Sequence, residues 1–275
     1  MQLCRTVAEV RSLRPKFARL GFVPTMGYLH EGHLRLVRRA KAACGAAAVS
    51  IFVNPIQFAA DDDLERYPRD LARDLALAEA AGTDFVFAPE AGELYPRGFT
   101  TRVDVGLTEG AENRARPGHF AGVATVVTKL FNIIQPSLAV FGQKDAEQAA
   151  VIRKLARDLD LGIKIEIAPT AREADGLAMS SRNSYLTPSE RAAAVVLSRA
   201  LQAAEFAFAQ GERDPAVLRA RALTVLAAEP LARVDYVAVA DPDTLNPLSL
   251  PAERILLSLA ARIGATRLID NTVLG

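Results

Sequence analysis

The chain reads PTMGYLHEGHL at residues 24–34, directly after the apolar run Gly21-Phe22-Val23 and directly before a helical pattern. The apolar run predicts a buried strand, so the segment predicts a strand, a tight turn and a helix start. N–H groups at a helix start point toward a ligand, and the helix dipole favours negative charge. His30 and His33 are three residues apart, so both face one side and can donate to a phosphate or carry a proton. Gly32 between them lets a ligand approach the backbone, and the stretch therefore predicts an anion site.

The composition predicts an ordinary globular protein. The 275 residues are 50% hydrophobic and 24% charged, with a formal net charge of +1. This length suits one large domain or two smaller ones. The small net charge argues against a large nucleic-acid footprint, and we see no apolar run long enough to span a membrane.

The N-terminus and the cysteines point to the cytoplasm. The first residues contain no hydrophobic signal region. Cys4 and Cys44 provide neither a disulfide framework nor metal-type spacing. We therefore expect a reduced cytoplasmic protein.

Strands alternate with helices through the first part of the chain. The expected strands are residues 21–23, 46–53, 84–89, 101–105, 138–142 and 164–169. The expected helices are residues 6–20, broken near Pro15, then 34–43, 71–81, 123–134 and 146–159. This alternation predicts an α/β domain with a parallel, Rossmann-like sheet that binds ligands outside the carboxyl ends of its strands.

The pattern changes after about residue 175. We expect one long helix at 188–210, another at 214–228, and short strands at 234–239, 255–260 and 267–270. These elements predict a small α+β domain. The expected division is a Rossmann-like domain at 1–175 and a smaller C-terminal α+β domain at 176–275.

Further motifs follow in order, at the expected ends of strands. They are NPIQF at 54–58, RARPGHFAG at 114–122, GQKDAEQ at 142–148 and READGLAMSSRN at 172–183. With the opening stretch, they resemble the pantoate–β-alanine ligase family of the HxGH nucleotidyltransferase superfamily. The match is colinear from Val23 to about Asn183, and Asp270-Asn271 also fits.

The resemblance implies that the domain at 1–175 binds the nucleotide and pantoate and that the domain at 176–275 closes over the ATP site. It also implies a set of site residues. Nucleotide contacts are implied at Met26, Gly27, Tyr28, Leu29, His30, Glu31, Gly32, His33, Gly142, Gln143, Lys144, Asp145, Ala171, Met179, Ser180, Ser181 and Arg182. Pantoate or β-alanine contacts are implied at Pro24, Thr25, Met26, Gln57, Arg116 and Gln148. Catalytic roles are implied for His30, His33, Lys144 and Arg182, and no side chain is implied as a metal ligand.

Two positions depart from the usual family pattern. Gln143 stands where the family most often has Glu, which removes one negative charge. Ala171 stands where the family often has Val, at a position that contacts adenine largely through its backbone. The matching positions around both residues are intact.

The resemblance also implies a reaction. Pantoate and ATP would form pantoyl adenylate and pyrophosphate, and β-alanine would then release AMP and pantothenate. ATP would be a substrate, with Mg²⁺ held mainly by its phosphates, and the protein would be a homodimer without nucleic-acid or membrane partners. The chain shows no Ser–His–Asp or cysteine nucleophile pattern, so we expect catalysis by positioning and electrostatics.

Other interpretations stay open from the residues alone. The chain could be a sibling HxGH nucleotidyltransferase or a silent nucleotide-binding protein. His30 and His33 could be surface or capping histidines, or could form a zinc site with His119. Arg116 could lie in a surface loop and residues 172–183 in a polar linker, and residues 61–63 are expected to form a solvated loop.

Overall fold

The computed structural model describes residues 1–59, 63–107 and 109–275, so Asp61 and Asp62 of the expected acidic loop lie outside the described residues. The chain divides into two compact units. The first comprises Met1–Gly106, Arg116–Gly142 and Val151–Ala168. The second comprises Leu107–Ala115, Gln143–Ala150 and Pro169–Gly275. The two units are therefore interleaved in sequence, whereas we expected a single boundary after residue 175.

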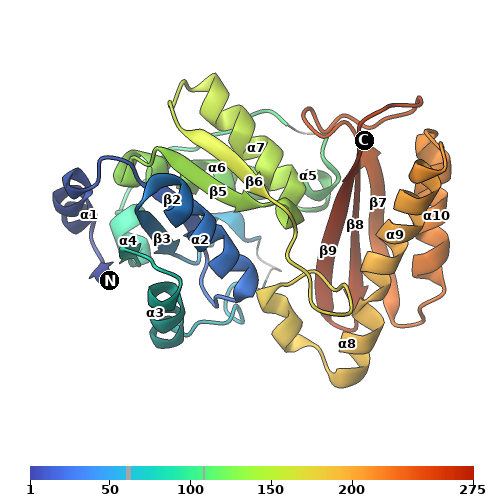
Figure 1. The fold of residues 1–275 in the computed structure, drawn as a ribbon, viewed down its shortest axis with the longest axis horizontal. Helices are drawn as coiled ribbons and strands as arrows, with labels where there is room; N and C mark the ends of the chain where they lie inside the picture. The colour runs from blue at the N-terminus through green and yellow to red at the C-terminus, as the bar shows by residue number, and fades with distance from the viewer. Residues whose placement is uncertain (60–62, 108) are drawn as a thin grey trace. The chain divides into compact units, whose positions relative to one another are not determined.

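The first unit is an α/β structure, in which helices pack on a parallel β-sheet, as predicted (Figure 1). Its strands are β1 (Gln2–Cys4), β2 (Gly21–Thr25), β3 (Ala47–Ile51), β4 (Phe85–Phe87), β5 (Leu138–Gly142) and β6 (Lys164–Ala168). Its helices are α1 (Val7–Leu13), η1 (Arg14–Lys16), α2 (Glu31–Cys44), η2 (Pro55–Gln57), α3 (Leu71–Ala80), α4 (Ala91–Leu94) and α6 (His119–Ile134). Helix α7 (Ala146–Asp158) begins in the second unit and ends in the first.

The strand order in this sheet is β1-β4-β3-β2-β5-β6, and every pair is parallel. Strand β2 is central and buried on both faces, because Val23 packs with Val37 of α2 on one face while Phe22 stacks edge-on against Phe131 of α6 on the other. The chain leaves β2 toward β3 on one side and later returns to β5 on the other. The sheet therefore has its topological switch point between β2 and β5, which is where such sheets bind ligands.

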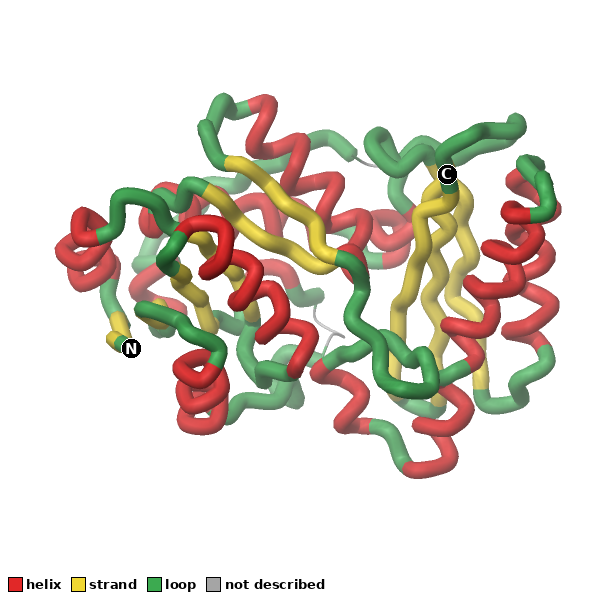
Figure 2. Tube along the Cα trace, in the orientation of Figure 1, coloured by secondary structure: helices red, strands yellow, loops and turns green. Residues whose placement is uncertain are grey.

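The second unit is a small α+β structure, also as predicted. Strands β7 (Ala232–Ala240), β8 (Ile255–Ile263) and β9 (Thr266–Leu274) form an antiparallel sheet in that order. Its helices are α5 (Ala111–Ala115), η3 (Gln143–Asp145), η4 (Ser181–Tyr185), α8 (Pro188–Ala194), α9 (Val196–Ala209) and α10 (Pro215–Ala227). Figure 2 shows α9 and α10 along one face of the three strands, where Leu197, Leu201, Leu218 and Leu257 are buried together.

Two expectations about elements were wrong, and one strand was not expected. Residues 101–105 are not a strand, because the N–H of Val103 donates to Thr125 Oγ1 at 2.9 Å and not to a neighbouring strand. The helix expected at 188–210 is interrupted at Val195, whose carbonyl accepts from Ser198 Oγ at 3.0 Å. Strand β1 was missed, since three residues are too few to show a period.

The expectation about membrane spans also needs correction. Residues 188–209 are long and apolar enough to cross a membrane by length and composition alone. Half of the apolar 18-residue segment within it is buried in the protein, and Leu197, Ala200 and Leu201 of α9 lie in the core of the second unit. Its apolar character follows from core packing.

Candidate active site

The turn after β2 lies at the switch point of the sheet. Pairing between β2 and β5 covers only Gly21 and Phe22, whereas pairing between β2 and β3 continues to Thr25. Pro24 has no N–H to donate, in keeping with the early end of the β5 ladder. Thr25 Oγ1 donates to the carbonyl of Ser50 at 2.7 Å and accepts from the N–H of Gly27 at 3.1 Å. The strand thus opens toward the predicted anion site, and Thr25 fixes the start of the turn.

Asp74 of α3 fixes the middle of the turn. Its carboxylate accepts from the N–H groups of Tyr28 and Leu29, each at 2.7 Å. Tyr28 has a φ of 51°, which is uncommon for a residue with a side chain, and Gly27 has a φ of 85°. Burial raises the pKa of Asp74, while the two backbone hydrogen bonds oppose that rise. The sequence signal for this contact is an acidic residue, Asp74, at an otherwise apolar position of α3, and we missed it.

His30 and His33 lie side by side at the start of α2. Their ring centroids are 4.0 Å apart, with 37° between the ring planes. The N–H of His30 donates to Nδ1 of His33 at 3.3 Å. Because Nδ1 accepts, the neutral His33 ring carries its proton on Nε2, where it can donate to a phosphate. The Glu31 carboxylate pairs with the Arg38 guanidinium at 2.6 Å.

Gln57 is buried, and its amide is oriented by neighbours. Its Oε1 accepts from Asn54 Nδ2 at 2.9 Å, and its Nε2 lies 3.3 Å from the sulfur of Met26. Asn54 also donates to the carbonyl of Gly122 at 3.1 Å and accepts from the hydroxyl of Tyr95 at 2.7 Å. The structure therefore brings Gln57 together with the turn through Met26.

His119 and Arg116 form a second contact with the Gln57 segment. Nδ1 of His119 lies 2.8 Å from the carbonyl of Gln57, and Nε2 lies 3.2 Å from a guanidinium nitrogen of Arg116. Nδ1 therefore donates and Nε2 accepts. Both ring nitrogens are engaged, so His119 is not placed as a zinc ligand. Across the described ranges, no group of three or more His, Cys, Asp or Glu side chains could hold a metal ion.

In the second unit, the turn η3 presents Lys144 and Asp145. The Lys144 ammonium lies 3.3 Å from Asp145 Oδ1. Asn271 of β9 donates to the carbonyls of Gln143 and Lys144 at 3.0 and 2.7 Å, and accepts from Gln143 Nε2 at 3.0 Å. Gln148 is half-buried on the first turns of α7. The structure therefore ties the Lys144 turn to a strand more than a hundred residues away.

The segment 171–183 is a hairpin followed by the turn η4. The N–H of Met179 donates to the carbonyl of Ala171 at 2.9 Å, and Ser180 Oγ accepts from the N–H of Arg182 at 3.3 Å. Ser181 is buried. Asn183 Nδ2 donates to the carbonyl of Ala178 at 3.1 Å. These contacts give the segment a defined conformation, which argues against a polar linker.

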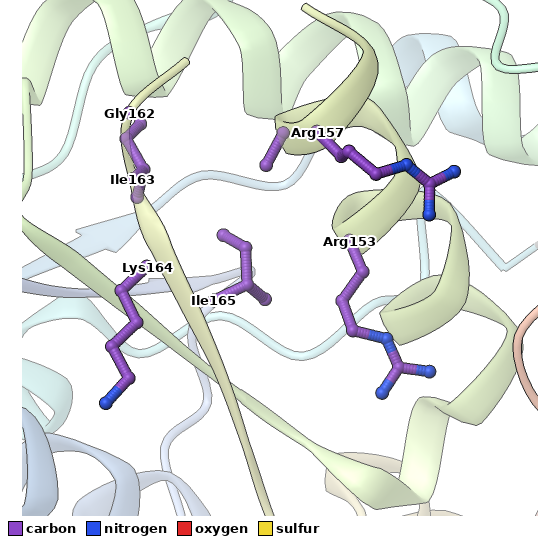
Figure 3. Close-up of a pocket in the computed structure, with 7 residues that line it drawn as sticks. Arg153, Arg157, Gly162, Ile163, Lys164 and Ile165 are labelled. Carbon is purple, nitrogen blue, oxygen red and sulfur yellow. The ribbon is translucent and has the colours of Figure 1, made fainter. Parts of the chain in front are cut away.

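A separate hollow of about 400 Å³ lies in the first unit between α7 and β6 (Figure 3). Arg153 and Arg157 extend from the helix and Lys164 from the strand. Its remaining lining residues are Ala156, Gly162, Ile163 and Ile165. None of the predicted site residues lines this hollow, so it does not belong to the candidate active site.

The comparisons with known proteins cover the whole chain. The family model described as pantoate-beta-alanine ligase matches residues 2–273. The pantothenate synthetase of Herpetosiphon aurantiacus is 57% identical over 276 residues, covering 100% of both chains.

Solved structures agree. The crystal structure of pantothenate synthetase from Thermus thermophilus has a TM-score of 0.95 at 48% identity and covers 99% of each chain. That of pantoate-beta-alanine ligase from Francisella tularensis, complexed with beta-gamma ATP and beta-alanine, has a TM-score of 0.82 at 32% identity. It covers 99% of this chain and 97% of its own.

Proposed function

Because the chain belongs to the pantoate-beta-alanine ligase family, and so is a ligase that makes pantothenate with ATP, we propose that its reaction runs through a pantoyl adenylate. A carboxylate oxygen of pantoate attacks the α-phosphorus of ATP, and the bond to the bridging oxygen breaks to release pyrophosphate. The amine nitrogen of β-alanine, once deprotonated, attacks the acyl carbon. The bond to the adenylate oxygen then breaks, and AMP and pantothenate leave.

The observation that carries this proposal is the orientation of His33 at the switch point. Its Nδ1 accepts from the backbone of His30, so the neutral ring presents a donor at Nε2 beside the N-terminus of α2. A donor placed before the reaction stabilises charge as it develops on phosphate oxygens. The helix N-terminus adds backbone N–H groups and a favourable dipole. Together they suit displacement at a phosphorus atom.

The second unit supplies cations for the leaving pyrophosphate. Lys144 is a compact charge on a short turn, and Arg182 offers a planar fork of donors at the start of η4. In the proposal, Ser180 and Ser181 bind the β- and γ-phosphates with Arg182. Asp145 accepts from the ribose hydroxyls of ATP.

Pantoate is bound by amides in this proposal. Gln57 and Gln148 contact its hydroxyls, so the carboxylate stays free to attack. An arginine on that carboxylate would pin and neutralise the nucleophile. Asn54 Nδ2 donates a hydrogen bond to Oε1 of Gln57 at 2.9 Å. We therefore infer that Gln57 contacts pantoate chiefly through its N–H donors.

Several further properties extend the proposal. Mg²⁺ enters with the substrate, held mainly by the ATP phosphates, since this ion often binds through phosphates with few protein ligands. The C-terminal domain closes over bound ATP, and Arg116 contacts an anionic substrate. We also propose a cytoplasmic homodimer without a nucleic-acid partner, in keeping with the net charge of +1.

An ATP–pyrophosphate exchange assay, with and without pantoate, tests the adenylate. We expect exchange of label from pyrophosphate into ATP only when pantoate is present, and without β-alanine. A sibling nucleotidyltransferase would use a phosphorylated acceptor and show no β-alanine dependence, and a silent nucleotide-binding protein would bind ATP without exchange. Pantothenate formation with no pantoate-dependent exchange would overturn the adenylate route.

A further inference from the structure

Asn271 of β9 uses its whole side-chain amide on one turn. Its Nδ2 donates to the consecutive carbonyls of Gln143 and Lys144 at 3.0 and 2.7 Å. Its Oδ1 accepts from Gln143 Nε2 at 3.0 Å. Only 4% of Asn271 is exposed, so water cannot readily replace these bonds. The backbone beside the Lys144 ammonium therefore has its position set by a buried side chain.

The preceding residue, Asp270, binds a different segment. Its Oδ2 accepts from Arg172 at 2.7 Å, and its Oδ1 accepts from Arg172 at 3.1 Å and from the N–H of Asn271 at 2.8 Å. Arg172 also donates to the carbonyl of Gly176 at 3.0 Å, across the hairpin that leads to Met179. Burial raises the pKa of Asp270, and the Arg172 guanidinium opposes that rise.

Adjacent residues in a strand point to opposite faces of the sheet. Asp270 and Asn271 therefore reach the Arg172 hairpin and the Lys144 turn from opposite faces of one strand. Strand β9 is a rigid base, because its register with β8 is unbroken from Ile255↔Leu274 to Ile263↔Thr266. Two loops attached to one rigid strand keep a defined separation.

We propose that Asp270 and Asn271 are positioning residues that fix the Lys144 turn and the Arg182 segment relative to each other, so that both cations meet the same polyphosphate. The inference rests on the proposed function, and it concerns two side chains that bind the Lys144 turn and the Arg172 hairpin. Positioning of charged groups by a rigid second layer is what makes their electrostatic contribution large. The consequence is confined to the half-reaction that releases pyrophosphate.

The discriminating variant is Asn271→Asp. It keeps the size of the side chain and the acceptor for Gln143, but it sets a carboxylate oxygen against two carbonyls. We expect single-turnover pyrophosphate release to fall on the order of tenfold to a hundredfold, the scale of a small misplacement. Supplied pantoyl adenylate should react with β-alanine within about twofold of wild type, because no pyrophosphate leaves in that step. Asn246→Asp, the same change at an exposed position of the same unit, is the control.

Hydrogen–deuterium exchange gives a readout that does not depend on the chemistry. In Asn271→Asp, exchange should rise in peptides covering 143–145 and stay unchanged in 171–179. Asp270→Asn should show the reverse pattern. Unchanged exchange in 143–145, or an equal loss of both half-reactions in Asn271→Asp, would overturn the inference. If the wild type shows no pantoate-dependent ATP–pyrophosphate exchange, that result would instead count against the proposed adenylate.

Discussion

Removal of the Asp74 carboxylate should destabilise the protein and also displace the histidine turn. Asp74 is 1% exposed and accepts two backbone N–H groups at 2.7 Å. In Asp74→Ala, the buried N–H of Leu29 loses its partner, at a cost of about 1–3 kcal/mol. The N–H of Tyr28 is only partly buried, so its loss adds about 1 kcal/mol. We expect unfolding free energy to fall by about 2–4 kcal/mol in total.

The effect on catalysis follows from the backbone of the turn. Tyr28 has a φ of 51°, a conformation that costs about 1–2 kcal/mol for a residue with a side chain. Without Asp74, the turn relaxes toward ordinary dihedral angles and His33 moves. A shift of about 1 Å lowers the rate on the order of a hundredfold. Single-turnover pyrophosphate release, measured at a temperature where the variant is folded, gives this rate.

Asp70→Ala is the matched control. Asp70 caps the N-terminus of α3 by accepting from the N–H of Arg73 at 3.0 Å, and this bond lies within the helix end and does not involve the histidine turn. The substitution should lower stability by about 1 kcal/mol, the usual value of a helix cap. Its rate of pyrophosphate release should match that of wild type. If folded Asp74→Ala also releases pyrophosphate at the wild-type rate, the reasoning about the turn is refuted.

Three further predictions concern the proposed roles, and a fourth concerns the buried carboxyl group of Glu147 on α7. His33→Ala should slow single-turnover pyrophosphate release by about a hundredfold, or roughly 3 kcal/mol, with ATP affinity nearly unchanged; a loss below about threefold contradicts the role. Lys144→Ala and Arg182→Ala should slow that step but spare the reaction of supplied pantoyl adenylate with β-alanine, and equal losses would show the roles are misassigned. Gln57→Glu should raise the KM for pantoate more than Gln57→Ala does, because it places a like charge near the substrate carboxylate, while the KM for ATP stays constant. Steady-state kinetics measures both constants, and a KM for pantoate in Gln57→Glu equal to that of wild type would contradict the proposed contact. Burial raises the pKa of Glu147, so the stability of wild type relative to Glu147→Gln should be greatest below about pH 4 and fall as pH rises through the raised pKa; urea unfolding across pH checks the sign.

Short-range signals in the chain were sufficient for most of the elements and for the motif at the sheet's switch point. The apolar run ending at Val23, the glycines of the turn and the paired histidines lie within a dozen residues of one another. Period and turn chemistry act over this range, so the strand, turn and helix could be predicted. The same holds for α8, where Thr187 and Glu190 form a capping box around Pro188.

The expected strand at 101–105 failed because a strand also needs a partner. Alternating residues are compatible with pairing, but the N–H of Val103 is taken by the hydroxyl of Thr125. The one-residue interruption at Val195 is likewise invisible to hydrophobic period, since the apolar run at residues 192–197 continues through it. Local propensity states what a segment can do, and its neighbours decide what it does.

The groups that fix the candidate site come from far along the chain. Asp74 reaches Leu29 across 45 residues, and Asn271 reaches the carbonyl of Gln143 across 128. A buried backbone group must find a hydrogen-bond partner, but its own sequence does not say which side chain will supply it. That choice depends on how the strands and helices pack. The chain alone therefore predicted which residues would meet the phosphates, and only the folded structure showed which residues hold those predicted contacts in place.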